Sequence, residues 1–240
     1  MRTLSTTLLA AQQAGSIDAL VKIVLTSGAS SYTYTKPQIL DITYKENGNL
    51  QSAEITLDNN DGTLTDIDLR GYKGVLSFGA ITANEGSPEE YSDVAQLWVV
   101  AQRFDSIADK PLICTLSLVG ICNLMAEDKA SEVYQPDDTD VKTVKTIIQE
   151  IIGDNGVTML SCFNHCQKYD AVFDSEDALI DSYTPKDAYR IYTSNNRLSA
   201  INRLLDYTKC VMRAEADGKL HVFVPTTTGV VYDYEYSLGD

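Results

Sequence analysis

Apolar and polar residues alternate with a period of two from Leu20 to Val119, and this alternation limits the fold more than any other feature. Successive side chains of a β-strand point to opposite faces, so the period indicates half-buried strands. We expect strands over residues 21–25, 40–44, 53–57, 74–81, 97–104 and 112–119. Closely spaced strands with little helix between them favour a barrel or a sandwich.

One hairpin stands out locally. Asn47-Gly48 lies between two of the expected strands, and both residue types tolerate positive φ, so the pair predicts a tight type I′ turn. The returning strand then places Ala53, Ile55 and Leu57 on one face and polar residues on the other.

The pattern changes near Glu127. Residues 127–140 are polar and include Pro136, which is typical of a linker. Beyond them an apolar stripe with helical spacing, preceded by acidic residues and ended by Gly153, predicts a helix. The stripe consists of Val141, Val144, Ile147, Ile148, Ile151 and Ile152.

A second helix is expected over residues 195–207, and a hairpin with its turn at Asp217-Gly218 follows it. The inward residues of this helix would be Leu198, Ile201, Leu204 and Leu205. The second half of the chain is therefore predicted to be α+β, and the whole chain mainly β.

These patterns predict four parts: an N-terminal arm (1–16), a first β-barrel-like domain (17–126), a linker (127–140) and a second α+β domain (141–240). We interpret the arm as a short helix, because threonines interrupt the apolar run that a signal peptide needs. The strand expected over 230–236 has no partner after it. Either the chain is a fragment, truncated at its C-terminus, or a neighbouring subunit completes this edge.

Composition excludes some classes of function. The chain has 34 acidic and 19 basic residues among 240, a formal net charge of −15. Sequence-independent binding to nucleic acid needs a basic patch, which this balance argues against. No stretch approaches the ~20 apolar residues of a membrane helix. Five cysteines, an odd number in a chain too large to need disulfides, indicate synthesis in a reducing compartment.

Two segments resemble metal sites but fall short of them. Cys162, His165 and Cys166 offer zinc ligands, yet a structural zinc site needs four and no second pair accompanies them. Residues 58–62 (DNNDG) would place Gly62 where a calcium loop needs an oxygen ligand, so a turn is the better interpretation. We expect no metal and no cofactor.

Catalytic signatures are also missing from the sequence. It contains two histidines and neither a G-x-S-x-G nor a P-loop motif, so we expect no enzyme activity. A converging carboxylate pair stays open, since sequence does not show which acids meet.

The 14 tyrosines are compatible with two interpretations. Tyrosine is enriched at protein interfaces, and it is also favoured in strands. As assembly contacts we select Leu4 and Leu8 of the arm together with Tyr232, Tyr234 and Tyr236 of the terminal strand.

Three segments resemble one known family. Residues 1–12 (MRTLSTTLLAAQ) are similar to the start of tail proteins in phage and prophage genomes. Residues 53–62 (AEITLDNNDG) resemble a strand and turn of the bacteriophage baseplate-hub and tail-tip family. Residues 198–224, a helix followed by a hairpin with Asp217-Gly218-Lys219, resemble the same family. The order and spacing of the three segments carry the resemblance.

The resemblance implies two tail-tube-like β-barrel domains with packed helices, assembled as a trimeric ring with two such domains per chain. One side of the ring would dock the tail tube and the other would hold spike or fibre proteins. DNA would only pass through the channel. The protein would lie in the virion tail after assembly in the host cytoplasm. Members of this family usually continue beyond the point where this chain stops.

We therefore expect a structural component of a phage tail tip or baseplate hub, which joins the tube to tip proteins and encloses the ejection channel. One alternative is a carbohydrate- or receptor-binding tail module, although Trp98 is the only tryptophan available for such a surface. The second alternative is a cell-wall hydrolase with a carboxylate pair.

Overall fold

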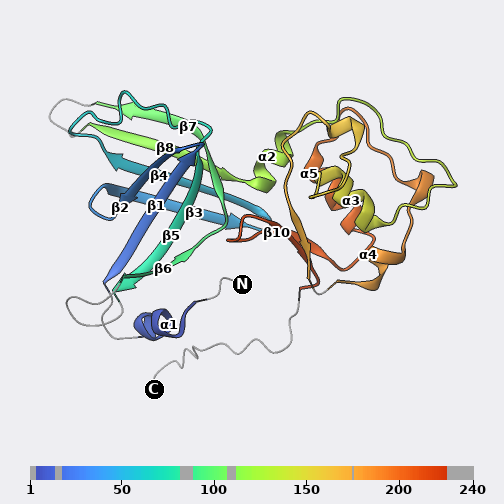
Figure 1. Cartoon of the computed structure of the whole chain (residues 1–240), viewed down its shortest axis with the longest axis horizontal. Coiled ribbons are helices and arrows are strands. Elements are labelled where there is room, and N and C mark those ends of the chain that lie inside the picture. Colours follow the sequence, from blue (N-terminus) through green and yellow to red (C-terminus); the bar gives the residue numbers. More distant parts are fainter. Residues whose placement is uncertain (1–3, 14–17, 82–88, 107–111, 175, 226–240) are drawn as a thin grey trace, which may run out of the picture.

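The computed structural model describes residues 4–13, 18–81, 89–106, 112–174 and 176–225. A large sheet lies on the left of Figure 1 and a group of helices with a small sheet on the right, joined at α2 (Ile121–Glu127). We call residues 18–120 the sheet half and residues 121–225 the mixed half. The predicted class, mainly β with an α+β second half, is confirmed.

The sheet half is one antiparallel sheet of eight strands. Its spatial order is β2-β1-β5-β7-β8-β4-β3, and β6 pairs with β5. The strands are β1 Ala19–Ser27, β2 Ser30–Thr35, β3 Ile39–Asn47, β4 Leu50–Asp58, β5 Lys73–Ile81, β6 Glu89–Asp93, β7 Leu97–Asp105 and β8 Ile113–Gly120. All the strands expected from the alternation are present, and β2 and β6 are additional.

The alternation corresponds to burial. In β4, Ala53, Ile55 and Leu57 are buried as predicted, and Ile55 lies opposite Leu116 of β8. Each such aliphatic side chain contributes roughly 1.5–3 kcal/mol when removed from water. One face of the sheet therefore holds a continuous apolar core, to which Tyr32, Tyr34 and Tyr44 add half-buried rings.

The predicted β3–β4 hairpin is confirmed, but its turn lies one residue later than expected. Asn47 pairs with Leu50, so Gly48 and Asn49 form the turn. Gly48 has φ of 62°, whereas Asn49 is not among the residues with positive φ. Positive φ at the first turn position alone is the pattern of a type II′ turn, so the type I′ prediction was wrong.

A bulge at Val100 changes the alternation within β7. The pairing with β8 shifts between Val99 and Ala101, so one residue has no partner in the ladder. Before the bulge Leu97 and Val99 face the core, and after it Gln102 does, donating from Nε2 to Ile67 O at 2.9 Å. A bulge of this kind bends the strand and increases its twist.

Strand β8 continues directly into α2 with no residue between them. Gly120, the last residue of β8, lies against Gln51 of β4. A Cβ atom added at Gly120 would come 2.9 Å from Gln51 Oε1. Ile121, Cys122 and Met125 of α2 are fully buried in the core of the mixed half. A strand of one half thus leads into the core of the other.

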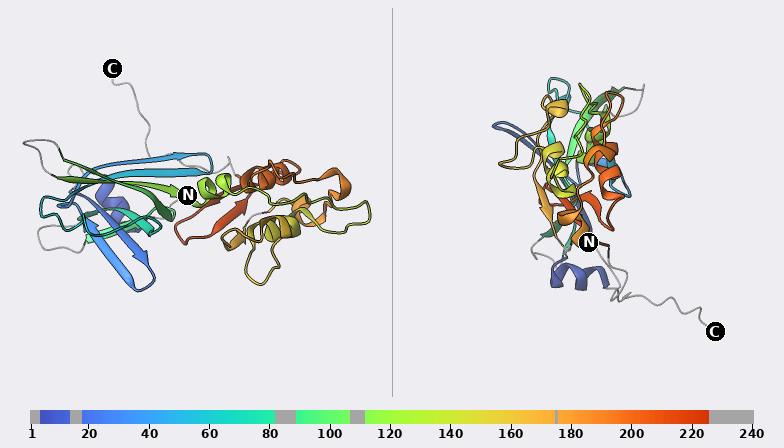
Figure 2. Two further views of the ribbon diagram at one scale, coloured as in Figure 1. Left: turned by 90° about the horizontal axis from the view of Figure 1, so that it is seen from above. Right: turned by 90° about the vertical axis from the view of Figure 1, so that its right-hand side faces the viewer.

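The mixed half contains a three-stranded sheet of order β10-β11-β9, in which β9 runs parallel to β11. The left panel of Figure 2 shows the two halves side by side along the long axis. The remaining elements are α3 Val144–Ile152, η1 Ser161–Phe163, β9 Ala171–Phe173, α4 Ala178–Ser182, η2 Lys186–Ala188, α5 Arg197–Leu205, β10 Val211–Ala214 and β11 Leu220–Phe223. Both predicted helices and the predicted hairpin are present.

Helix α3 begins later than the apolar stripe indicated. Thr143 caps it by accepting from Thr146 N, and Gly153 ends it with φ of 72°, as predicted. Val141 precedes the helix and is 81% exposed, so its assignment to the buried stripe was wrong. The other five stripe residues are buried.

Residues 128–140, which the sequence predicted as part of a linker, belong to the mixed half and pack against the rest of it. Isolated bridges join Lys129 to Asn196 and Tyr134 to Ile191. Ala130 is 4% exposed and belongs to the core of the mixed half. The division into domains 17–126 and 141–240 stays a prediction.

A buried arginine joins three parts of the mixed half. Arg197 is 0% exposed and donates to Ile151 O at 2.9 Å and Ile152 O at 2.6 Å, the end of α3. It also donates to Gln167 O at 2.7 Å and Asp128 Oδ2 at 3.0 Å. Carbonyls at a helix end lack intrahelical donors, and Arg197 supplies them.

Among the described helices, none is long and apolar enough to cross a membrane.

Candidate assembly surfaces

The outer strands of the large sheet are β2 and β3, at opposite ends of its order. Within the described residues, β2 pairs with β1 and β3 pairs with β4. Each therefore carries one row of backbone groups without a strand partner. Such rows are able to pair with another chain.

Of the predicted arm contacts, Leu8 packs inside its own chain. It lies in α1 (Thr6–Gln13), is 2% exposed, and its N–H bonds to Ser5 Oγ at 3.0 Å. Leu4 is half-buried, and Leu9 exposes 38% of its surface. The outer side of α1 thus presents Leu9, which the sequence interpretation did not select.

The tyrosines near the two ends of the chain differ in what the structure describes. Tyr232, Tyr234 and Tyr236, together with the predicted terminal strand, lie outside the described residues. Tyr32 packs against Tyr72, with ring centroids 5.9 Å apart, and burial raises the pKa of Tyr34 to about 12. Tyr32 and Tyr34 of β2 thus add their rings to the core of the sheet half.

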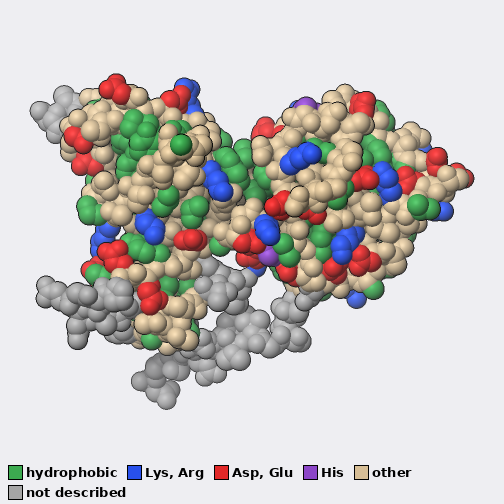
Figure 3. Space-filling model, in the orientation of Figure 1, with side chains coloured by type: hydrophobic (Ala, Val, Ile, Leu, Met, Phe, Trp, Pro, Cys, Tyr) green, Lys and Arg blue, Asp and Glu red, His purple; other side chains and the backbone are tan. Residues whose placement is uncertain are grey.

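A cleft of about 860 Å³ lies between the halves. On one side are the ends of β3 and β4 together with β6 and the residues after it, and on the other are β10, the β10–β11 turn and the end of β9. The lining includes five carboxylates, Glu46, Asp93, Asp174, Glu215 and Asp217. Red acidic side chains gather on both sides of this junction in Figure 3.

Among the described residues, two basic side chains line the cleft, and both contact acids. Arg213 bonds to Glu215 through its Nε at 2.6 Å. His221 lies between Asp174 (2.7 Å from Nδ1) and Asp217 (3.1 Å from Nε2). Burial alone would lower the pKa of His221, but these two carboxylates outweigh it, and the pKa is raised.

Sequence interpretation did not find this cluster. Asp174 lies 47 residues from His221, so only the parallel pairing of β9 with β11 brings the two together.

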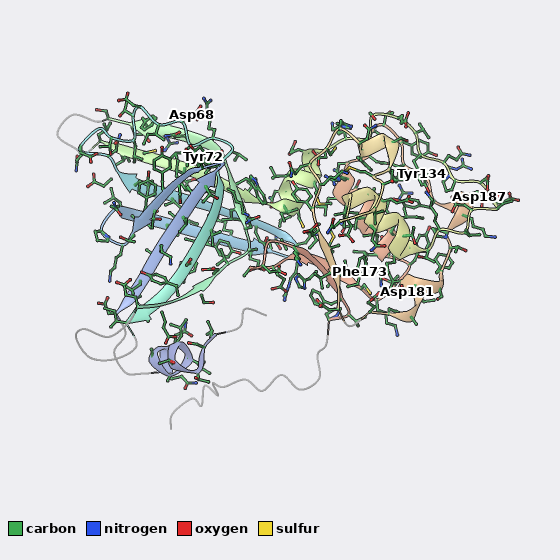
Figure 4. The ribbon with its side chains drawn as sticks, in the orientation of Figure 1. Asp68, Tyr72, Tyr134, Phe173, Asp181 and Asp187 are labelled. Carbon is green, nitrogen blue, oxygen red and sulfur yellow. The ribbon has the colours of Figure 1, made fainter. Side chains whose placement is uncertain are left out.

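A small aromatic patch lies on α4 and the end of α5. Tyr183 and Tyr207 pack with centroids 5.0 Å apart, and Leu179 beside them is 46% exposed. Nearby, Lys145 binds Glu176 at 2.9 Å and Asp181 at 3.3 Å, with its ammonium 4.8 Å from the Phe173 ring centroid. Figure 4 shows Phe173 and Asp181 near each other on this side.

The cysteine cluster is divided between interior and surface. Cys162 is buried in η1, and burial raises its pKa to about 11, whereas Cys166 is half-buried. All five cysteines are free thiols. Among the described residues, no three His, Cys, Asp or Glu side chains are close enough together to hold a metal ion.

The turn at residues 58–62 is organised by a buried asparagine. Asn59 is 0% exposed, accepts from Leu64 N at 2.8 Å and donates to Thr65 Oγ1 at 3.2 Å. Gly62, with φ of 73°, bonds back to Asn59 O at 2.9 Å. The segment is a turn, as predicted.

Several carboxyl groups have displaced pKa values, and each of these is lowered. Hydrogen bonds from Thr63, Arg70 and Thr139 lower the pKa of Asp61, Asp68 and Asp137 respectively, that of Asp68 to about 2. At Asp217, burial alone would raise the pKa, but the hydrogen bonds from Lys219 N and His221 outweigh burial, and the pKa is lowered. A carboxyl that serves as general acid needs the opposite displacement.

Comparison with known proteins gives matches in structure alone. No protein-family model and no curated protein sequence matches the chain. A tail protein from Neisseria meningitidis MC58 superposes with a TM-score of 0.51, at 13% identity over 85% of this chain. The 43 kDa tail protein of prophage MuSo2 from Shewanella oneidensis gives 0.50, at 12% identity over 87%. The Francisella PdpA-VgrG complex gives 0.53, at 12% identity over 92%.

These matches show a shared fold. The chain spans 51% and 56% of the two tail proteins and 31% of the matched chain in the Francisella complex. The chain has the fold of phage tail proteins, as the three resembling segments predicted.

Proposed function

We propose that this protein is a structural component of a bacteriophage tail tip or baseplate hub, which joins the tail tube to tip proteins and encloses the ejection channel. The observation that carries the proposal is the fold shared with two phage tail proteins over 85% and 87% of the chain. Its mechanism is geometric: copies of the chain assemble with one another and with adjoining tail proteins.

The two outer strands support head-to-tail assembly. Because β2 and β3 lie at opposite ends of one sheet, β3 of one copy is able to pair with β2 of the next. Such a contact uses different surfaces on the two partners, so it forms a closed ring when the rotation fits. We favour a trimer, since two tube-like domains per chain would then give six around the channel.

The net charge of −15 is compatible with a DNA channel. Acidic side chains facing a lumen would repel the DNA backbone and keep it from binding during passage. In this proposal DNA passes through the ring without being held, and the protein lies in the virion tail after assembly in the host cytoplasm.

Mass measurement in solution with electron microscopy tests the assembly. We expect ring-shaped trimers of the full chain at micromolar concentration. Counted from the β1–β2 turn, the alternation of an antiparallel ladder directs the N–H of Thr33 away from β1. Thr33→Pro removes this outer donor and should shift the protein toward monomer, whereas Thr33→Ser should still assemble. A wild-type chain that stays monomeric would remove the ring from the proposal.

The arm gives a second test. Deleting residues 1–16 should weaken assembly while the remaining chain keeps its fold, because we assign Leu4 and the outer side of α1 to contacts between copies. Since Leu8 is buried within the chain, Leu9→Ser is the matched surface variant. Normal assembly of the truncated protein would exclude the arm.

The alternatives have less support from the described residues. A carbohydrate-binding surface needs exposed aromatic rings. Trp98 is half-buried and lies edge-on to Tyr169 at 6.3 Å, so such a surface would depend on Tyr183 and Tyr207 of the small aromatic patch. A hydrolase needs a carboxyl group with a raised pKa, and the displaced ones described above are lowered.

A further inference from the structure

The cleft between the halves borders a strand edge without a partner. Strand β7 pairs with β8 only as far as Leu97 and Gly120, where β8 ends and α2 begins. Strand β6 continues along β5 beyond that point. Within the described residues β6 pairs with β5 alone, so the place that β8 would occupy beside β6 holds no strand.

The backbone of β6 directs donors toward this place. Val94 donates its N–H to Leu76 O at 2.9 Å, in register with the β5–β6 ladder. Hydrogen-bonding positions alternate along an antiparallel strand, so the N–H groups of Tyr91 and Asp93 point away from β5. Both residues line the cleft.

The walls of the cleft carry negative charge. Five carboxylates line it against Arg213 and His221, and both of these already bind carboxylates of the same cleft. Counted over the described residues alone, and with His221 charged, the lining has a formal charge of −3, from five acids less two bases. A cationic ligand complements this field.

An unpaired buried acceptor lies at the same junction. Gln51 lines the cleft, is 2% exposed and donates to Ala214 O at 3.2 Å across the two halves. Its Oε1 accepts from no described group. Buried polar atoms are nearly always bonded, so this oxygen marks a place at the junction where a further donor would fit.

We propose that the cleft binds an extended basic segment of another protein, which adds as a strand to the outer edge of β6 and contacts β10 and the β10–β11 turn. The five residues of β6 span about 17 Å, so five or six residues of the segment would pair. Main-chain bonds hold such a peptide, and its alternate side chains select it. Lysine or arginine at alternate positions would face the carboxylates.

The occupant comes from a different protein because no segment within residues 1–240 suits the cleft. Residues 1–3 carry Arg2 but are shorter than the five residues of β6, and residues 107–111 carry Lys110 together with Asp109 and with Pro111, which lacks the ladder donor. Residues 226–240 contain Asp233, Glu235 and Asp240 and no basic residue. Residues 82–88 before β6 contain Glu85 and no basic residue. Both would be repelled by the cleft. The binding needs no ring, so it is independent of the assembly proposed above.

Selection from a displayed library of random eight-residue peptides against the full chain tests the inference. We expect proline-free peptides with Lys or Arg at alternate positions. The best peptide, made synthetically, should slow amide hydrogen exchange at Tyr91 and Asp93 at least about tenfold. Its Pro-substituted form should not bind, because proline lacks the ladder donor.

Charge variants locate the site. Glu46→Gln with Asp217→Asn removes two cleft charges and should weaken peptide binding about fivefold at low salt. The matched control, Asp66→Asn with Asp187→Asn, removes two charges away from the cleft and should leave affinity unchanged. Three outcomes overturn the inference: no peptide is enriched, enriched peptides bind both double variants equally, or protection of β6 arises without peptide as protein concentration rises, which would make the occupant a second copy.

Discussion

The two halves solve the problem of their backbone edges in different ways. Among the described residues, the sheet half has strand edges without a partner at β2, β3 and β6, and its core follows from a simple alternation. The mixed half instead closes the end of α3 on the guanidinium of Arg197, which donates four hydrogen bonds: three to carbonyls from two segments and one to a carboxylate. Strand edges without a partner are suited to pairing with other chains. The carbonyls at the end of α3 already have a donor within the chain, so they are not available for such pairing.

Substitution of Arg197 should have the largest effect and would show whether the halves unfold separately. Arg197→Met leaves the carbonyls of Ile151, Ile152 and Gln167 without this donor and Asp128 without its cation. We expect a loss of about 4 kcal/mol in the free energy of unfolding of the mixed half. Native-state hydrogen exchange measures it. The exposed Arg203→Met should cost less than about 1 kcal/mol. Equal loss of protection in the sheet half would break the comparison.

Two substitutions that each leave a cavity, one in each core, test further whether the halves unfold separately. Leu116 and Ile148 are both 0% exposed, one in each core. Leu116→Ala and Ile148→Ala should each cost about 3 kcal/mol, because a cavity remains where the side chain was. Exchange should increase mainly in the half that carries the substitution. If both variants open the same amides, the two cores form a single cooperative unit.

Gly79 tests how β6 is held on the sheet. A Cβ atom there would come 2.1 Å from Glu90 O, a backbone atom that moves only with the strand. Gly79→Ala should therefore displace β6 from β5 and cost about 2 kcal/mol. Gly74→Ala is the control, since its nearest neighbour is the flexible Leu118 side chain at 2.9 Å. Urea unfolding and exchange at β6 amides would separate the two variants, and equal effects would contradict the expectation.

His221 should give the smallest effect, and one that depends on pH. Because its pKa is raised in the folded state by Asp174 and Asp217, its stabilisation is present below the unfolded pKa of about 6.5 and is lost as pH rises through the folded value. The difference in unfolding free energy between wild type and His221→Gln should be larger at pH 5.5 than at pH 8.5. Its size should stay below about 1 kcal/mol. A difference that grows with pH would reverse the assignment.

Local patterns predicted what depends on neighbours in sequence. The strands, the C-terminal cap of α3 at Gly153 and the Asp217-Gly218 turn follow from alternation, a left-handed cap and turn chemistry. The wrong assignment of Val141 also comes from a local pattern. The apolar stripe begins at Val141, before Thr143, which caps the helix at its start.

What the sequence did not reveal depends on distant partners. Arg197 meets Ile151 and Asp128 across 46 and 69 residues, and nothing in its own neighbourhood marks it as buried. Residues 128–140 are polar and were therefore predicted as a linker. Their backbone nevertheless forms bridges to Asn196 and Ile191 in the same half. The cleft combines β6, β10 and the end of β9, which only the complete fold places together.

The direct passage of β8 into α2 has a mechanical consequence. With no loop residue at Gly120-Ile121, and with Gln51 bonded to Ala214 across the junction, there is no slack to absorb a tilt of one half against the other. Tension applied at an edge of the large sheet would therefore pass through β8 directly into α2 and the core of the mixed half.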